Sequence, residues 1–250
     1  MITRLELRRL AVREKVSLGA LEKDYVLSTV LRQVYADESL WETLVLKGGT
    51  ALHKLYLHRR LSLDLDFTAL QPVTLDVVRP SLEVPELQGQ VKEHRAFHDA
   101  LTINRLGFVG PLGFPNSIKV DISFRETVSL PPVTRLMETL YYEPFPVQAM
   151  QLEEMVAEKL RAALMRKTPR DYFDLWLVVE EKAIDATLVP ELLKAKMETV
   201  GLEYDPTLLW QELGTLERLW RDDLRELMPQ VPEFSSMIEA LRDGLSALLL

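Results

Sequence analysis

The chain has 250 residues, a formal net charge of −8 at pH 7 and no cysteine, and 47% of its residues are hydrophobic. This length and composition are those of a folded globular protein with one large domain or two small ones. The lack of cysteine excludes disulfides, thiolate metal sites and a cysteine nucleophile, and it is typical of a reducing compartment. The negative charge argues against a protein whose whole surface binds nucleic acid, although a local basic groove remains compatible with it.

The N-terminus carries charges where a secretory signal needs an apolar run, and no 18 apolar residues follow one another anywhere in the chain. We therefore expect a cytoplasmic protein that does not use a membrane. Three clusters of basic residues are candidates for a local groove: Arg4, Arg8, Arg9 and Arg13; the segment from His53 to Arg60; and Arg161, Arg166, Lys167 and Arg170. Each cluster is explained equally well as a solvated helix face.

Two helices are expected at the start of the chain. Residues 3–16 have the pattern of a short amphipathic helix, and a second helix is expected from Ser17 to about Tyr35, with apolar residues three or four apart. The charged triplet that begins at Glu22 is interpreted as part of the solvated first turn of this second helix. Residues 37–39 indicate a loop and the start of another helix, which precedes a strand at residues 44–46.

The next segment combines a glycine turn with an acidic strand. Gly48 and Gly49 follow the strand at 44–46, a helix is expected over residues 51–57, and residues 60–67 are predicted to form a second strand. Side chains alternate along a strand, so Asp64 and Asp66 share one face while the apolar residues between them share the other.

This combination has chemical consequences. Two carboxylates side by side favour a divalent cation between them, because oxygen ligands suit a hard cation and its charge offsets their repulsion. The free backbone amides of a glycine turn that opens a helix attract an anion such as a phosphate. Arg59 or Arg60 is close enough in sequence to neutralise a phosphate or a carboxylate. The segment therefore indicates chemistry on a nucleoside triphosphate.

The middle of the chain has weaker signals. Prolines divide residues 71–90 into short helices and loops, residues 93–108 are predicted to form one strand, and residues 107–116 a long turn. His94 and His98 are four residues apart but have no evident third metal ligand. Residues 117–124 alternate cleanly and predict a strand with Asp121 on its polar side. Because a carboxylate in a strand needs a partner, Asp121 is predicted to be the third metal ligand.

Helices are expected throughout the last hundred residues. Pro131, Pro132, Pro144 and Pro146 are interpreted as a junction between two lobes, followed by helices over residues 152–165, 171–181, 191–200, 207–226 and 235–249. Lys159 and Arg166 are two helical turns apart and share a face. Lys159 could reach into a cleft or lie on an ordinary surface. Asp171 is explained as a helix cap, but with Asp174 it could also orient Lys159 or Arg166.

Five elements in this order resemble the AbiEii/AbiGii toxin family of nucleotidyltransferases. They are Lys47-Gly48-Gly49-Thr50-Ala51-Leu52; Arg60, Ser62, Asp64 and Asp66 of the acidic strand; Asp121; Glu158-Lys159-Leu160; and Arg170, Asp171 and Asp174. Residues 22–25 also resemble the N-terminal signature of that family, and the resemblance spans about residues 20–180.

The resemblance implies an α/β (α+β) fold in which a nucleotidyltransferase-type mixed-sheet lobe, residues 1–135, is followed by an all-helical C-terminal lobe, residues 148–250, with the active site between them. It implies a Mg²⁺-dependent toxin, with Mn²⁺ as the alternative ion, that adds nucleotides from a nucleoside triphosphate to the 3′ end of tRNA. A cognate antitoxin is the implied protein partner.

Motif and chemistry together give each candidate residue a role. The expected metal ligands are Asp64, Asp66 and Asp121, which would hold two ions about 4 Å apart. The expected catalytic residues are these three with Lys159 and Asp171. The expected nucleotide-binding residues are Lys47, Gly48, Gly49, Thr50, Arg60, Ser62, Lys159, Arg166 and Asp174. Both the Thr50 hydroxyl and the backbone amides of the turn are expected to contact the triphosphate.

Two alternatives remain at this stage. The acceptor could be a protein hydroxyl or a small molecule, which the acidic charge of the chain mildly favours. The chain could also be a degenerate transferase that only binds a nucleotide or an antitoxin. The three aspartates argue against this second alternative, because an apolar residue or threonine would stabilise a merely structural strand better.

Overall fold

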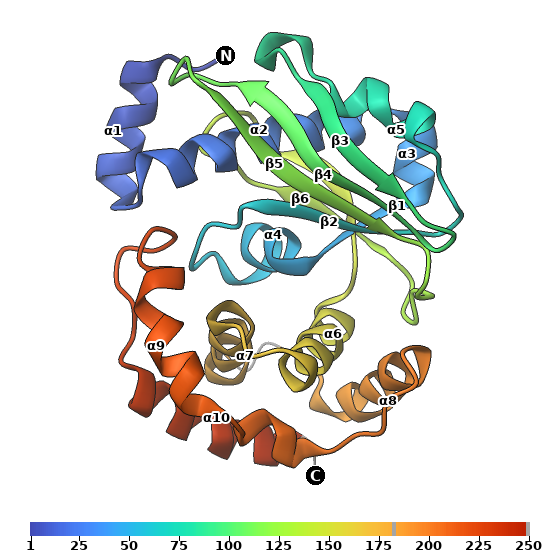
Figure 1. Cartoon of the computed structure of the whole chain (residues 1–250), viewed down its shortest axis with the longest axis vertical. Coiled ribbons are helices and arrows are strands. Elements are labelled where there is room, and N and C mark those ends of the chain that lie inside the picture. Colours follow the sequence, from blue (N-terminus) through green and yellow to red (C-terminus); the bar gives the residue numbers. More distant parts are fainter. Residues whose placement is uncertain (182–183, 249–250) are drawn as a thin grey trace. The chain divides into compact units, whose positions relative to one another are not determined.

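The computed structural model describes residues 1–181 and 184–248 and divides the chain into two compact units, Met1–Met150 and Gln151–Leu250 (Figure 1). The first unit is a seven-stranded mixed sheet with helices, and the second is helical. This is the α/β fold that the sequence predicts. No helix among the described residues has both the length and the apolar character needed to cross a membrane.

The sheet of the first unit has the strand order β3-β4-β5-β2-β1-β7-β6. Its strands are β1 (Leu44–Lys47), β2 (Asp64–Ala69), β3 (Gln90–Ala96), β4 (Ala100–Val109), β5 (Pro115–Ser123), β6 (Val133–Met137) and β7 (Phe145–Ala149). β2 pairs parallel with β5, β1 pairs parallel with β7, and the other pairs are antiparallel. The acidic strand β2 therefore lies in the middle of the sheet, between β1 and β5.

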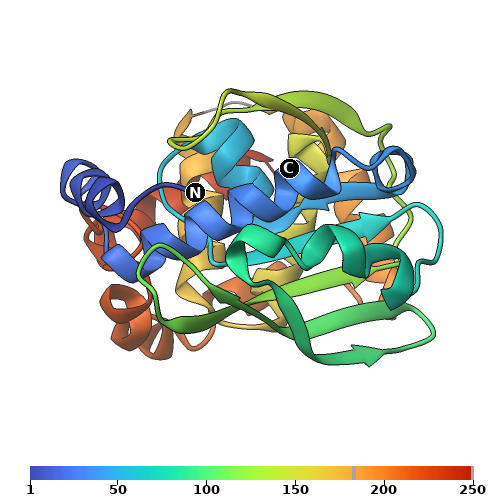
Figure 2. The same ribbon diagram turned by 90° about the horizontal axis from the view of Figure 1, so that it is seen from above.

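Five α-helices belong to this unit: α1 (Arg4–Glu14), α2 (Leu18–Val34), α3 (Glu38–Thr43), α4 (Gly48–Leu52) and α5 (Leu75–Leu82). A π-helical turn, His53–Leu57, continues α4, and a 3₁₀ turn, Pro85–Leu87, follows α5. The helix starts are those that the sequence predicts, because Thr3, Ser17 and Asp37 each cap a helix with the side chain. Figure 2 shows α2 running across the sheet with α5 beside it.

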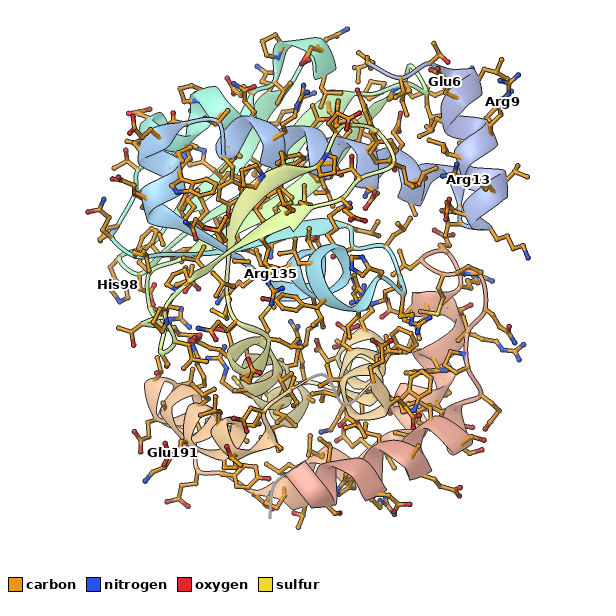
Figure 3. All side chains as sticks on the ribbon, turned by 180° about the vertical axis from the view of Figure 1, so that it is seen from behind. Glu6, Arg9, Arg13, His98, Arg135 and Glu191 are labelled. Atoms are coloured by element: carbon orange, nitrogen blue, oxygen red, sulfur yellow. The ribbon has the colours of Figure 1, made fainter. Side chains whose placement is uncertain are left out.

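The basic residues of α1 lie on its exposed side. Arg4, Arg8, Arg9 and Arg13 are all exposed, whereas Leu7 and Ala11 on the opposite side pack against Leu21 of α2. Figure 3 shows Arg9 and Arg13 along this helix together with Glu6, which closes the capping box with Thr3. The helix is thus fixed to the unit by an apolar stripe and presents positive charge to solvent.

The structure corrects several secondary-structure predictions for this unit. Residues 93–108 are not one strand, because β3 and β4 form a hairpin whose chain reverses at residues 97–99, and β4 continues through Gly107 so that the following turn is shorter than predicted. The proline-rich segment is not a junction between lobes. It contains β6 and β7, which extend the sheet beyond β1.

The second unit contains α6 (Leu152–Met165), α7 (Pro169–Glu181), α8 (Val189–Thr199), α9 (Leu213–Leu224) and α10 (Phe234–Leu248), with 3₁₀ turns at Ala186–Leu188 and Pro206–Trp210. The predicted helix over residues 207–226 is in fact the second of these turns followed by α9. The predicted end of the last helix, Leu249, lies outside the described residues. α6 contacts both α7 and α8, and α7 contacts α9 and α10.

A buried ion pair joins α6 to α8. The Lys196 side chain is 2% exposed, and its Nζ lies 2.6 Å from Oε1 of Glu154 and 3.3 Å from Oε1 of Glu158. A buried ammonium is tolerated only with such partners, and here two carboxylates on one helix face supply them. The acidic N-terminal half of α6 therefore has a structural partner within the unit.

Candidate active site

The glycine turn between β1 and α4 lies against the acidic strand. Gly48 has φ +70°, and a Cβ atom built on it would lie 2.2 Å from Oδ2 of Asp66. Lys47, the residue before it, pairs with Asp66 across β1 and β2. Glycine is required here for two reasons, its left-handed backbone and the approach of the Asp66 carboxylate.

Arg60 and Ser62 lie beside Gly49, the second glycine of the same turn. A Cβ atom on Gly49 would meet Oγ of Ser62 at 3.1 Å and Nη2 of Arg60 at 3.2 Å. Both side chains are buried, and Nη1 of Arg60 donates to the Leu61 carbonyl at 2.9 Å, which fixes the guanidinium. A guanidinium and a hydroxyl beside the Gly49 backbone are a suitable donor set for a phosphate.

Two other residues of this motif, Thr50 and Lys47, bind groups of the protein itself. Thr50 is fully buried, and its hydroxyl donates to the Asp64 carbonyl at 2.6 Å. The hydroxyl thus holds α4 against β2, and the expected contact of Thr50 with the triphosphate stays a prediction. Nζ of Lys47 lies 3.9 Å from Oε2 of Glu126, and both side chains are largely buried.

The carboxylates of β2 meet those of β5 through the register of the two strands. Asp66 pairs with Asp121, and Asp64 pairs with Lys119. Paired residues of neighbouring strands share a face, as do residues two apart on one strand, so the four side chains occupy one patch of one face. All three aspartates are half-buried, so solvent and ligands reach them.

Lys119 places a positive charge in this patch. Its Nζ forms an ion pair with Oδ2 of Asp121. Partial burial by itself lowers the pKa of Lys119, but the hydrogen bond to Asp121 and the charges of Asp121, Asp66 and Asp64 outweigh it and raise the pKa above its usual value. The sequence alone assigned Lys119 no role, although its spacing of two residues from Asp121 along β5 places both side chains on one face.

The donor set of this patch fits a divalent cation of the Mg²⁺ or Mn²⁺ type, which prefers carboxylate oxygens. Within residues 1–181 and 184–248, however, no three Asp, Glu, His or Cys side chains already converge as a metal cluster. The Lys119 ammonium supplies positive charge to the carboxylates in this arrangement. Asp64, Asp66 and Asp121 are therefore the residues that could hold a metal, once their side chains turn toward a common point.

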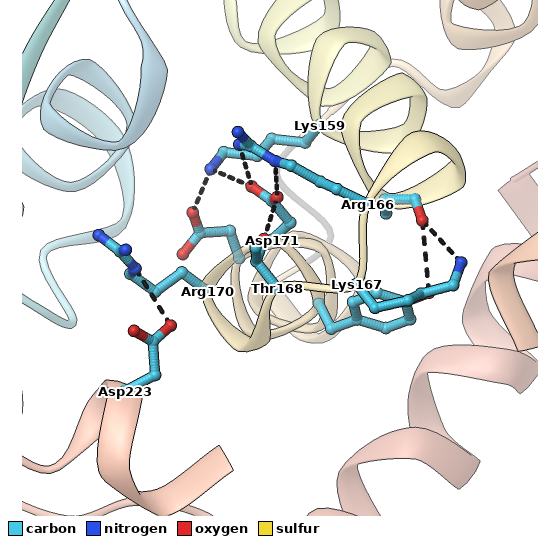
Figure 4. A network of polar contacts seen from close by, with 10 residues as sticks. Lys159, Arg166, Lys167, Thr168, Arg170, Asp171 and Asp223 are labelled. Atoms are coloured by element: carbon cyan, nitrogen blue, oxygen red, sulfur yellow. Dashed lines mark hydrogen bonds and ion pairs between the residues drawn. The ribbon is translucent and has the colours of Figure 1, made fainter. Parts of the chain in front are cut away.

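The candidate residues of the second unit form a compact ionic network (Figure 4). Nζ of Lys159 lies 2.9 Å from Oδ1 of Asp171 and 2.8 Å from Oδ2 of Asp174. Nε of Arg166 donates to Oδ2 of Asp171 at 2.9 Å, and the Thr168 hydroxyl donates to the same oxygen. Both aspartates are buried, and the Lys159 side chain is 14% exposed.

Asp171 has a larger role than that of a helix cap. Burial raises the pKa of this carboxyl, but Lys159 and Arg166, together with hydrogen bonds from Arg166 and Thr168, hold the pKa below its usual value. The carboxylate therefore stays charged and fixes Lys159 from the first turn of α7. Of the two interpretations of Lys159, an ordinary surface lysine is excluded, because two buried carboxylates hold its ammonium.

The charged residues at the start of α2 were also interpreted wrongly. Glu22 and Asp24 are buried rather than solvated. Oδ1 of Asp24 lies 2.7 Å from Nζ of Lys54, in the π-helical turn that continues the glycine-turn helix. Oε1 of Glu22 accepts from the Leu112 backbone at 2.8 Å. These residues connect α2 to the segment after the glycine turn and to the β4–β5 turn.

The histidines are not brought together as ligands. His53 is buried in the π-helical turn, whereas His58 is exposed. His94 lies on strand β3 and His98 in the following turn, both exposed. Because neither His94 nor His98 lies on a helix, their spacing of four residues does not bring them together on one helical face.

Comparisons with known proteins show the family and the fold of the chain. The family model described as nucleotidyl transferase AbiEii toxin, type IV TA system, matches residues 29–246. The fold is similar to that of MenT4, a nucleotidyltransferase toxin from Mycobacterium tuberculosis, with TM-score 0.77 and 23% identity over 99% of this chain and 90% of that one. It is also similar to JHP933 from Helicobacter pylori, with TM-score 0.63 and 19% identity over 94% and 93% of the two chains. No curated protein matches the sequence significantly.

Proposed function

The chain belongs to the AbiEii family of nucleotidyltransferase toxins of type IV toxin–antitoxin systems, and from this premise we propose which reaction it performs. In our proposal it moves a nucleoside monophosphate from a nucleoside triphosphate to the 3′ end of tRNA and requires Mg²⁺ or Mn²⁺. The observation that carries the proposal is the register of β2 and β5, which gathers Asp64, Asp66 and Asp121 on one face beside the glycine turn.

The proposed reaction is a displacement at the α-phosphorus of the nucleotide. The acceptor hydroxyl oxygen forms a bond to this phosphorus, the bond to the oxygen that bridges to the β-phosphate breaks, and pyrophosphate leaves. A bound divalent cation supplies positive charge for deprotonation of the hydroxyl and for the departing pyrophosphate. Asp121 accepts the hydroxyl proton in our proposal, and Asp64 and Asp66 complete the ligand set.

The other groups bind and orient the nucleotide. Arg60, Ser62 and the Gly49 backbone lie together and present donors suited to phosphate oxygens. We assign to Lys159 the neutralisation of charge on the triphosphate, because Asp171 and Asp174 hold its ammonium in one position. Arg166 shares Asp171 with Lys159 and is assigned a supporting role in nucleotide binding.

RNA is favoured as the acceptor by the surface of α1. Residues 1–15 contain five basic and two acidic side chains in a protein of net charge −8, and the four arginines of α1 are exposed. A local basic surface on an acidic protein attracts a polyanion without making the whole protein bind nucleic acid. A small-molecule acceptor would have no use for such a surface.

The test is a labelling experiment with purified protein, each α-³²P-labelled nucleoside triphosphate, Mg²⁺ and total bacterial RNA, analysed on a denaturing gel. Asp64→Ala is the control, and circular dichroism verifies that it is folded. We expect label on a tRNA-sized band that is absent with the variant. Label on a protein or a small product would overturn the proposal that tRNA is the acceptor. The absence of any labelled product, with retained nucleotide binding, would indicate a non-catalytic nucleotide- or antitoxin-binding protein.

A further inference from the structure

Lys119 places a positive charge among the carboxylates of the β2–β5 patch. Asp64, Asp66, Asp121 and Lys119 form two register pairs on neighbouring parallel strands, Asp64 with Lys119 and Asp66 with Asp121. Lys47, the register partner of Asp66 on β1, brings a second ammonium to the same face.

The ammonium does not lie apart from the carboxylates. Nζ of Lys119 is ion-paired with Oδ2 of Asp121, one of the oxygens that would ligate a metal. The side chains of Lys119 and Asp121 are 46% and 33% exposed, so neither is locked in the core. A lysine on a flexible four-carbon stem can leave such a position without disturbing the strand, because the stem reaches solvent.

We propose that Lys119 is a built-in counter-cation that occupies the carboxylate patch of the metal-free protein and competes with the divalent cation for Asp121. In the metal-free state it limits repulsion among three neighbouring carboxylates. When a metal ion binds, the ammonium gives up Asp121. Lys119 is thus a positioning residue that weakens metal affinity and stabilises the metal-free fold, and this inference rests on the metal-dependent function proposed above.

The proposed competition predicts the direction of two changes, one in the stability of the metal-free protein and one in its affinity for the metal ion. Removal of the ammonium takes the ion-pair partner from Asp121 and lowers the positive charge near Asp64 and Asp66, so the metal-free protein loses stability while the site attracts cations more strongly. Both effects are electrostatic at a partly exposed site and decrease as salt screens the charges. A residue that merely packed against its neighbours would lower stability without strengthening metal binding.

The experiment measures Mn²⁺ binding and thermal unfolding of the full chain after removal of metal with EDTA and dialysis. Free Mn²⁺ is counted by electron paramagnetic resonance for the parent, Lys119→Met, Lys119→Gln and Lys119→Arg. Lys92→Met is the matched control, because Lys92 is an exposed strand lysine on β3. Asp121→Asn identifies the Mn²⁺ that binds at this patch.

We expect Lys119→Met and Lys119→Gln to bind Mn²⁺ about tenfold more tightly than the parent, roughly the effect of 1.4 kcal/mol. Their metal-free unfolding temperatures should be lower at low salt and recover with Mn²⁺, whereas Lys119→Arg and Lys92→Met should resemble the parent. If Lys119→Met does not fold, the same measurements on Lys119→Gln decide.

Two negative outcomes have different meanings. In the first outcome, Mn²⁺ binding requires Asp121 but its affinity changes by less than twofold when residue 119 is neutral. This outcome overturns the counter-cation role of Lys119 and leaves the proposed function intact. A parent protein that binds no Mn²⁺ through Asp121, even at millimolar concentration, overturns the metal-dependent function and the counter-cation together.

Discussion

The carboxylate of Asp66 occupies the space where any residue but glycine at position 48 would place its Cβ atom, 2.2 Å from Oδ2. The two motifs of the first unit, the glycine turn and the acidic strand, are therefore one structure. A change on either side is expected to displace the other.

Gly48→Ala should lower both stability and nucleotidyl transfer. The alanine would adopt a left-handed backbone and displace the Asp66 carboxylate, so we expect a loss of about 1–3 kcal/mol in the free energy of unfolding. The rate of transfer should fall at least about tenfold, because a ligand of the proposed metal moves. Urea unfolding and the labelling assay measure the two effects.

Gly19→Ala is the control for this substitution. Gly19 lies in α2, and a Cβ atom there would meet nothing within 4 Å. It should stabilise the protein by about 0.4–1 kcal/mol without changing transfer. Equal activities for Gly48→Ala and the parent would show that the contact with Asp66 has no functional importance.

Asp24→Asn should destabilise the first unit and slow transfer. Asp24 and Lys54 form a largely buried pair at 2.7 Å, and the Tyr141 hydroxyl donates to Asp24 at 3.1 Å. A neutral side chain at position 24 leaves the Lys54 charge without its carboxylate, at a cost of about 3 kcal/mol. The turn after α4 would loosen, and we expect the nucleotide KM to rise.

A double-mutant cycle with Lys54→Met measures this coupling. The two changes together should cost less than the sum of the single changes, because the uncompensated charge is then absent. Glu14→Gln, which disrupts the exposed pair with Arg13, should change stability by less than about 0.5 kcal/mol. Strict additivity of Asp24→Asn and Lys54→Met would contradict the proposed connection.

The sequence predicted the parts of the sheet that local pattern determines. β2 and β5 alternate cleanly and were found, and their aspartates lie on one face as expected. The β3–β4 hairpin was missed because its turn at Phe97 to Asp99 contains no glycine or proline. Contacts with a distant segment hold it instead: Asp99 accepts from Arg125 Nε at 2.6 Å, and the Phe124 backbone donates to the Asp99 carbonyl at 2.9 Å.

β6 and β7 were missed because proline usually interrupts a sheet. Pro146 is tolerated in β7 since the pairing of this strand with β1 is confined to Leu46 and Ala149, away from the proline.

The buried pair of Asp24 and Lys54 was missed because it depends on tertiary structure. Charged residues in an amphipathic helix indicate a solvated face, and only tertiary structure places the lysine that allows Asp24 to be buried.

Acid should weaken the second unit through Asp171. Its pKa is lowered in the folded protein, so its charge stabilises the fold above the unfolded-state pKa, near 3.9, and this contribution is lost as the pH falls through the lower folded-state value. The difference in unfolding free energy between the parent and Asp171→Asn should therefore be constant near neutral pH and shrink below about pH 4.

Urea titrations of both proteins between pH 3 and pH 7 measure this difference. Asp185→Asn is a suitable comparison, because the exposed Asp185 side chain caps a 3₁₀ turn by accepting from Thr187 and asparagine can keep this cap, so its effect should be much smaller than that of Asp171→Asn. A difference between the parent and Asp171→Asn that grows as the pH falls would contradict the lowered pKa.

Charge reversal on α1 should weaken the binding of the RNA acceptor and leave the binding of the nucleoside triphosphate unchanged. Arg8 and Arg9 are exposed on a helix fixed to the unit by Leu7 and Ala11, so Arg8→Glu with Arg9→Glu removes positive surface without removing core contacts. The KM for RNA should rise about tenfold or more and depend less steeply on salt, because fewer phosphates are neutralised. The affinity for nucleoside triphosphate should stay at the parent value, since neither arginine belongs to the glycine turn or the carboxylate patch.

A matched double change on another exposed surface, Arg218→Glu with Arg221→Glu on α9, controls for the altered net charge. An equal loss in both double variants would indicate a general effect of charge, and no loss in either would remove α1 from the acceptor site.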